Sequence, residues 1–142
     1  SEGQTLDTGT KVVHLAPKTY STVNSRSISK KGGKATYRSS IVVTPEARDS
    51  RSSVICESLM LDSSCRSDTI PVMDAVDIGH EAKIGRISEE AIYYIMSRGI
   101  SEAEARAMIV RGFAEPIAKE LPLEYAVEMN RLIDIELEGS IG

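Results

Sequence analysis

We expect a mainly β segment over residues 1–87 and a three-helix segment over residues 88–142, because the pattern of apolar residues changes near residue 88. Before that point, short runs rich in Val, Ile, Thr and Ser are separated by Gly, Pro, Asp and Ser-Ser, as is typical of strands and turns. After it, apolar residues recur at helical spacing. Short, evenly spaced strands suit a β-sandwich, a barrel or a β-solenoid equally well.

In chain order, the β segment contains six candidate strands, with a tight turn at Gly32-Gly33 between the second and the third. Because the aromatic fraction of the chain is only 4%, we expect the core between these strands to be aliphatic. The strands are expected over residues 12–15, 22–29, 35–43, 53–61, 69–73 and 82–87.

The first two helices carry clear start signals. Ser88 is a candidate N-cap for the first helix, which Gly99 should end. Ser101 and Glu104 form a capping box at the start of the second helix, expected over about residues 102–119.

The third helix should start with Pro122 in its first turn and stop at Gly139. Gly112 and Pro116 lie inside the second helix and predict a kink or a break there. Short connections indicate that the three helices pack together. An apolar stripe along the third helix comprises Leu123, Ala126, Val127, Ile133 and Leu137.

Composition narrows the class of partner. The net charge of −4 argues against nucleic acid, because binding phosphates requires a positive surface. No apolar run approaches the ~18 residues that a membrane span needs, and no stretch resembles a signal peptide. Two cysteines do not make a disulfide framework, which favours a reducing cytoplasm. The chain starts with Ser1 rather than Met, so we expect a piece of a longer protein.

The two cysteines could carry thiol or metal chemistry. Strand alternation puts Cys56 on one face with Val54 and Ser58, without indicating which face points inward. Cys56 is either a buried, inert cysteine or a soft thiolate ligand for sulfur or iron, which would need a nearby cation or metal to lower the pKa of the thiol. Cys65 follows an Asp-Ser-Ser turn and is either a secondary thiol or a solvent-near loop cysteine.

The histidines differ in their surroundings. His80 and Glu81 are adjacent, so they should face opposite sides of a regular strand. His80 is either a satisfied core residue or a metal ligand and proton carrier, and Glu81 could supply an oxygen ligand. His14 has no Cys or carboxylate near it in sequence, and we assign it no role.

Several motifs, in order, resemble the C-terminal part of the SufB/SufD family of scaffold subunits from the SUF iron–sulfur cluster assembly system. They include TYRSSI, CESLMLD, SDTIP, GHEA, MSRGIS and ELPLEYAVE. The ending ELPLEYAVE…ELEGS looks more like the SufB branch. The resemblance implies a right-handed parallel β-helix followed by a helical subdomain that docks an ABC-type ATPase, SufC. It also implies that Cys56 receives sulfur or holds a nascent cluster, with His80 and Glu81 at the contact between two scaffold chains.

These observations lead to two hypotheses. The first is a non-enzymatic scaffold that carries a transient iron–sulfur cluster, binds no nucleotide itself and relies on a SufC-like partner for ATP hydrolysis. Its second chain would be SufB or SufD-like, and we expect a homodimer because truncated β-helices expose unpaired strand edges. The alternative is an interaction module whose C-terminal helices bind the ATPase without metal chemistry in this chain.

Overall fold

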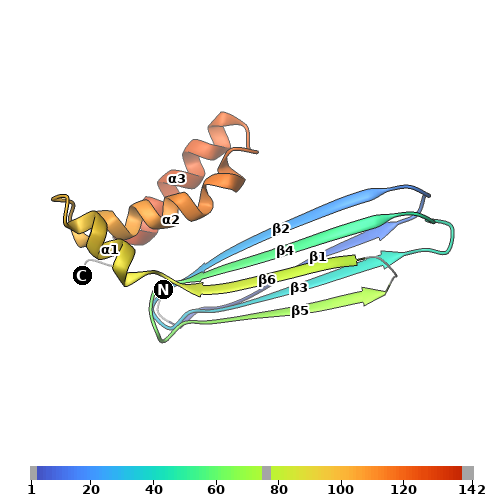
Figure 1. The fold of residues 1–142 in the computed structure, drawn as a ribbon, viewed down its shortest axis with the longest axis horizontal. Helices are drawn as coiled ribbons and strands as arrows, with labels where there is room; N and C mark the ends of the chain where they lie inside the picture. The colour runs from blue at the N-terminus through green and yellow to red at the C-terminus, as the bar shows by residue number, and fades with distance from the viewer. Residues whose placement is uncertain (1–2, 75–77, 139–142) are drawn as a thin grey trace. The chain divides into compact units, whose positions relative to one another are not determined.

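The computed structural model (Figure 1) describes residues 3–74 and 78–138 and contains, over these ranges, six β-strands followed by three α-helices. The chain divides into two compact units, which we call the β unit (residues 1–86) and the helical unit (residues 87–142). The strands are β1 (Thr5–His14), β2 (Tyr20–Ser29), β3 (Lys34–Val43), β4 (Arg51–Met60), β5 (Arg66–Asp74) and β6 (Ile78–Arg86). The helices are α1 (Glu89–Met96), α2 (Glu102–Ala118) and α3 (Leu123–Glu138).

Successive strands belong alternately to two sheets, and within each sheet the strands are parallel. The odd-numbered strands form one sheet in the order β1-β3-β5, and the even-numbered strands form the other in the order β2-β4-β6. Strands of the two sheets run in opposite directions, as Figure 1 shows. Each strand pairs with a strand one full turn away, so that Tyr20 of β2 aligns with Arg51 of β4. This topology is compatible with a parallel β-helix, and it differs from the antiparallel pairing of a sandwich or an up-and-down barrel.

Glycines shape the β unit at two places. The predicted turn at Gly32-Gly33 is present: Gly32 has a φ of 74°, which glycine adopts without steric cost, and the amide of Gly33 donates to the carbonyl of Lys30 at 2.9 Å. Gly9 of β1 lies against β3, where a Cβ atom would be only 2.6 Å from the carbonyl oxygen of Arg38. The spacing between β1 and β3 therefore leaves no room for a side chain at position 9.

The interior between the two sheets is aliphatic and partly lined by hydroxyl groups. Ile41 and Val54 are 0% and 1% exposed, and the buried apolar residues among those described are Ala, Ile, Val or Cys, as predicted. The Ser58 Oγ lies 2.8 Å from the Ser27 Oγ of the neighbouring strand and 2.7 Å from the Ser67 Oγ of the opposite sheet. Hydroxyl groups in this narrow space thus bond to one another across strands and between sheets.

Helices α1 and α2 begin at the predicted capping serines. The Ser88 Oγ accepts a hydrogen bond from the amide of Ala91 at 3.1 Å, and the Ser101 Oγ accepts one from the amide of Glu104 at 3.3 Å. Each bond satisfies an amide that the first turn of a helix leaves without an intrahelical partner. Helix α1 ends before Gly99, whose φ of 87° is left-handed, as expected at a helix stop.

The break expected inside α2 is absent. The helix runs without interruption from Glu102 to Ala118 and contains Pro116. Pro116 lies in the last turn, so the helix loses one hydrogen bond and ends two residues later. Gly112, the residue four positions before Pro116, also lies inside the unbroken helix.

Ion pairs join the three helices, which contact one another in sequence order. Arg106 of α2 lies 3.1 Å from Glu89 of α1, and Arg111 of α2 lies 2.5 Å from Asp134 of α3. Pro122 directly precedes α3 instead of lying in its first turn. None of the described helices is long and apolar enough to cross a membrane. The predicted stop at Gly139 lies outside the described residues.

Candidate functional site

Cys56 points into the interior between the two sheets, which answers the question that strand alternation left open. It is 3% exposed and forms the hydrophobic core cluster with Ile41 of β3 and Val54 of β4. On its own sheet, the register places Ser25 of β2 on one side of Cys56 and Ala82 of β6 on the other. The thiol therefore belongs to the inward-facing row of β4, in the middle strand of its sheet.

Burial raises the pKa of the Cys56 thiol, because the interior solvates a thiolate poorly. This is the opposite of the cation-assisted lowering that an activated thiolate requires. An anionic sulfur at this position therefore needs hydrogen-bond donors or a metal to replace the missing water.

His80 lies on the same inward face as Cys56. It aligns with Val54 in the register between β4 and β6, so it is the diagonal neighbour of Cys56. A strand spacing of about 4.8 Å and a rise of about 3.3 Å per residue put such diagonal Cα atoms about 8 Å apart. The Nε2 atom of His80 is buried and has no hydrogen-bond partner. This is not the satisfied core histidine that was the alternative prediction.

Glu81 faces the other way, as its adjacency to His80 predicted. Its side chain is 56% exposed, and its Oε1 lies 3.1 Å from the Nζ of Lys83. The structure thus brings Cys56 and His80 onto one face and leaves Glu81 on the other. Among the described residues, no three His, Cys, Asp or Glu side chains gather closely enough to hold a metal ion. Within the part of the chain that the structure describes, Cys56 and His80 are thus two neighbouring candidate ligands.

Two further polar groups in the interior were missed by the sequence analysis. The phenol oxygen of Tyr37 and the Oγ of Ser39 are buried and have no hydrogen-bond partner. Both residues lie on β3, on the same face as Ile41, and Tyr37 packs against the cluster that contains Cys56. A buried hydroxyl without a partner costs about 1–3 kcal/mol. The alternation in TYRSSI already placed Tyr37, Ser39 and Ile41 on one face, but no local signal linked them to Cys56.

Cys65 is part of the turn between β4 and β5. It is 8% exposed, so it is not the solvent-near cysteine that was one alternative. Its thiol donates to the Oδ1 of Asp62 at 3.3 Å. Asp62 also accepts hydrogen bonds from the Ser64 hydroxyl, the Lys31 amide and the Ser64 amide. These bonds, with the Ser64 hydroxyl contributing most, and the bond from the Cys65 thiol lower the pKa of Asp62 to about 2. The Asp62 carboxylate thus holds the turn together and accepts the hydrogen bond of the Cys65 thiol.

A second buried network surrounds His14, to which the sequence analysis gave no role. His14 is 4% exposed; its Nδ1 lies 2.5 Å from the Thr19 Oγ1 and its Nε2 lies 2.9 Å from the Ser21 Oγ. These hydroxyls continue to Ser50 and Ser52 of the next turn, each at 2.8 Å. Through Thr19 and Ser21, this network joins the β1–β2 connection to the β3–β4 connection, which lies one coil later.

The helical unit exposes many large apolar side chains, which no sequence motif assigned individually. On α3, Leu123 is 77% and Val127 is 59% exposed, so the predicted apolar stripe is only partly covered within the unit. Exposed apolar residues of this unit are Tyr93, Tyr94, Met96, Met108, Leu121, Leu123, Tyr125, Val127, Leu132 and Ile135. A partner-binding role for these helices stays a prediction.

Comparison with known proteins gives consistent matches. A family model described as the SufBD core domain of SUF system FeS cluster assembly matches residues 1–113. The chain is 54% identical over 145 residues to the iron–sulfur cluster assembly protein SufB of Bacillus subtilis, covering 99% of the chain and 31% of that relative. It is 51% identical over 145 residues to a SufBD family protein of Mycobacterium bovis, covering 99% of the chain and 17% of that relative. The chain thus spans about a third of the Bacillus relative and less of the other.

Proposed function

Because this chain belongs to the SufBD family of SUF iron–sulfur cluster assembly proteins, we propose that it is the C-terminal portion of a scaffold subunit. In this proposal the β unit is part of a right-handed parallel β-helix, and Cys56 receives sulfur or holds a nascent cluster. The observation that carries the proposal is the placement of Cys56 and His80 as diagonal neighbours on one interior face. The cluster is cargo that is passed on, and the chain itself is not an enzyme.

A second scaffold chain would complete the ligand set. His80 lies on β6, the edge strand of its sheet among the described residues, and edge strands are ready to pair with another chain. Two chains that meet there would offer two cysteines and two histidines to iron, which is enough for four ligands of mixed thiolate and imidazole type. Glu81 remains a candidate ligand only across this junction, because in its own chain it faces away from Cys56. We assign Cys65 at most a secondary role, since Asp62 occupies its thiol.

Nucleotide chemistry would come from a partner. We propose that the exposed apolar surface of α1, α2 and α3 docks a SufC-like ABC ATPase. Both cysteines are free thiols, which suits the cytoplasmic location that we propose. The second chain would be either identical, giving a homodimer, or SufD-like.

Anaerobic reconstitution with ferrous iron and sulfide tests the role of Cys56. The wild-type chain should gain the visible absorption of a cluster, and Cys56→Ala should not, because the thiolate ligand is lost. Ser25→Ala is the matched control, since it also trims an interior side chain beside Cys56 but removes no ligand. Equal absorption in Cys56→Ala and wild type would remove Cys56 from the mechanism.

The alternative function, an interaction module without metal chemistry, is favoured by two observations. Cys56 is buried in an apolar cluster, and ten large apolar side chains are exposed on the described part of the helical unit. Iron titration combined with a pull-down by the SufC-like ATPase separates the two functions. A module would retain the ATPase while taking up no iron specifically, whereas a scaffold should do both.

A further inference from the structure

The interior around Cys56 contains more hydrogen-bond donors than its contacts use. Ser39 is 1% exposed, and its Oγ has no partner. It lies on β3 between Tyr37 and Ile41, and both of these neighbours pack in the cluster that includes Cys56. Because residues 37, 39 and 41 share one face of the strand, the Ser39 hydroxyl points into the same space as the Cys56 thiol. The buried phenol oxygen of Tyr37 joins it there, also without a partner.

Two donors without acceptors, opposite a buried thiol, indicate a missing acceptor. The serines that lie further along the same interior show the contrast, because Ser27, Ser58 and Ser67 bond to one another. An atom attached to the Cys56 Sγ would extend about 2 Å farther into the space between the sheets. A sulfur atom in that position is an acceptor and, as a persulfide, carries negative charge that the interior cannot solvate without donors.

We propose that Tyr37 and Ser39 are positioning residues that donate hydrogen bonds to a sulfane sulfur carried by Cys56. This inference rests on the proposed role of Cys56 as a sulfur acceptor and names the groups that retain the sulfur. The sulfur donor is a persulfide or polysulfide. The Cys56 sulfur attacks the terminal sulfur of the donor, the donor S–S bond breaks and a new S–S bond forms on Cys56. A persulfide donor leaves as a thiol, and a polysulfide donor such as tetrasulfide leaves as a polysulfide with one sulfur fewer. In either case the leaving group takes up the Cys56 proton, so no separate oxidant or reductant is needed.

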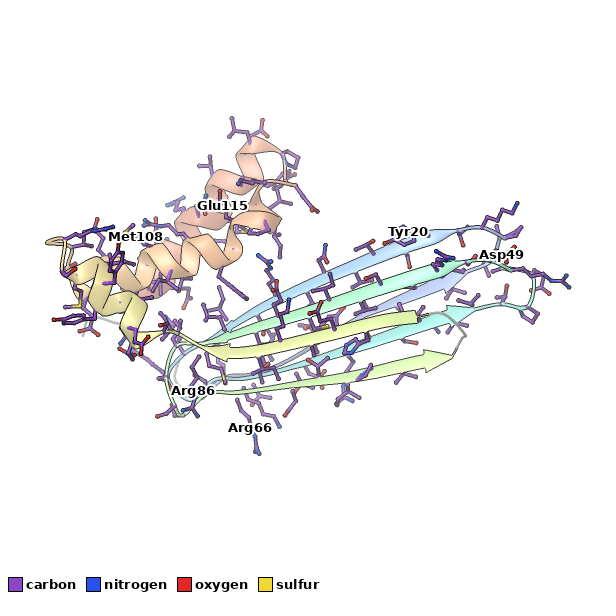
Figure 2. All side chains as sticks on the ribbon, in the orientation of Figure 1. Tyr20, Asp49, Arg66, Arg86, Met108 and Glu115 are labelled. Atoms are coloured by element: carbon purple, nitrogen blue, oxygen red, sulfur yellow. The ribbon has the colours of Figure 1, made fainter. Side chains whose placement is uncertain are left out.

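Sodium tetrasulfide is the probe for this proposal. The full chain is treated anaerobically, and site-resolved mass spectrometry measures the fraction of Cys56 that carries one added sulfur. The excess is then removed, and the loss of that sulfur to dilute cyanide is followed over time. Tyr37→Phe and Ser39→Ala should each shorten the lifetime of the added sulfur about fivefold, because each removes one donor. Tyr20→Phe is the matched control: Tyr20 is 70% exposed on the outer side of β2 (Figure 2), and the lifetime should not change.

A second measurement separates positioning from a merely structural role. Without added sulfur, urea unfolding should find Tyr37→Phe and Ser39→Ala at least as stable as wild type, because each variant deletes a buried hydroxyl that has no partner. In site-assigned fluorotyrosine NMR of the wild type, the chemical shift of Tyr37 should change when Cys56 is loaded with sulfur. The chemical shift of Tyr20 should not change. Either variant alone suffices if the other does not fold.

The outcomes distinguish this inference from the function on which it rests. If wild-type Cys56 gains no sulfur, the proposed function fails. If wild-type Cys56 gains sulfur and both variants retain it equally long, Tyr37 and Ser39 do not position it and only this inference is overturned. A loss of stability in the sulfur-free variants would show that the hydroxyls are structural, which overturns it too.

Discussion

Cys56 illustrates how one buried atom can be both a packing residue and a chemical one. A thiol packs as a small hydrophobe, which explains its place beside Ile41 and Val54. The same burial raises the pKa of the thiol, so the resting chain keeps a neutral Cys56 that is protected from bulk solvent. Reaction at this sulfur therefore depends on the groups around it, and His80, Tyr37 and Ser39 are the described neighbours with unused polar atoms.

Asp62 should make the stability of the chain sensitive to acid. Its hydrogen bonds lower the pKa of the carboxyl from 3.8 to about 2, so its stabilising contribution is complete above about pH 4 and is lost as the pH falls toward 2. We expect Asp62→Asn to lower the free energy of unfolding by about 1–2 kcal/mol at pH 7 and to flatten its decline between pH 4 and pH 2. Urea unfolding at several pH values measures both effects.

Asp68→Asn provides the control for Asp62. The side chain of Asp68 is 46% exposed and only 3.5 Å from the Nζ of Lys34, a surface ion pair of small energetic value. Its replacement should change the free energy of unfolding by less than about 0.5 kcal/mol. An equal acid response in both variants would contradict the special role assigned to Asp62.

At this scale the sequence predicted partners along one strand but not across the interior. Alternation grouped Val54, Cys56 and Ser58 on one face, and it separated His80 from Glu81, as the structure confirms. It could not predict that this face points inward, because the strand carries apolar residues on both sides. Tyr37 was missed because its link to Cys56 depends on how two sheets face each other, which no local pattern encodes.

Among the strands, Gly9 offers the sharpest test of the sheet spacing. Gly9→Ala should destabilise the chain by about 1–3 kcal/mol, because the new Cβ would meet the backbone carbonyl of Arg38 and push β1 from β3. Gly85→Ala on β6 is the matched control, since no heavy atom lies within 4 Å of a Cβ built there. Thermal and urea unfolding compare the two variants. Equal effects would mean that β1 moves away from β3 at little cost.

The elements themselves were largely predicted, because their signals are local. The six strands lie where β-branched runs and turn residues placed them, although β1 begins seven residues before the expected Val12. Its early residues, such as Asp7 and Gly9, have low strand propensity and are held by pairing with β3. Likewise, a kink or a break was expected at Gly112 and Pro116, but α2 is unbroken, because Pro116 lies in its last turn and disturbs little of the helix. Parallel pairing between distant strands was implied only by the family resemblance.

For the whole molecule, we predict self-association through the β5–β6 end of the β unit. Ile84 is 49% exposed on the inward-facing row of β6, which has no further strand beside it among the described residues. Ile84→Glu should weaken the dimer at least tenfold, because it places a charge in the apolar contact. Sedimentation over a range of concentrations measures the dissociation constant.

Leu6→Glu tests which end is used. Leu6 is 59% exposed on β1, at the opposite edge of the sheets. We expect the dimer of the Leu6→Glu variant to have a dissociation constant near that of the wild-type dimer. A wild-type chain that stays monomeric at all concentrations, or a larger effect of Leu6→Glu, would contradict assembly through β5 and β6.

The pairing of every strand with one about thirty residues distant also constrains how the chain acquires its structure. Tyr20 and Arg51 pair across a long stretch of chain rather than a local hairpin. The chain therefore loses the entropy of closing this loop before the hydrogen bonds between β2 and β4 can stabilise it. During synthesis, the edge of β2 that pairs with β4 therefore stays unpaired until β4 has left the ribosome. Each completed coil then offers a strand edge with which the next coil can pair. Slow, sequential maturation, with a period of vulnerability to aggregation, follows from the architecture itself.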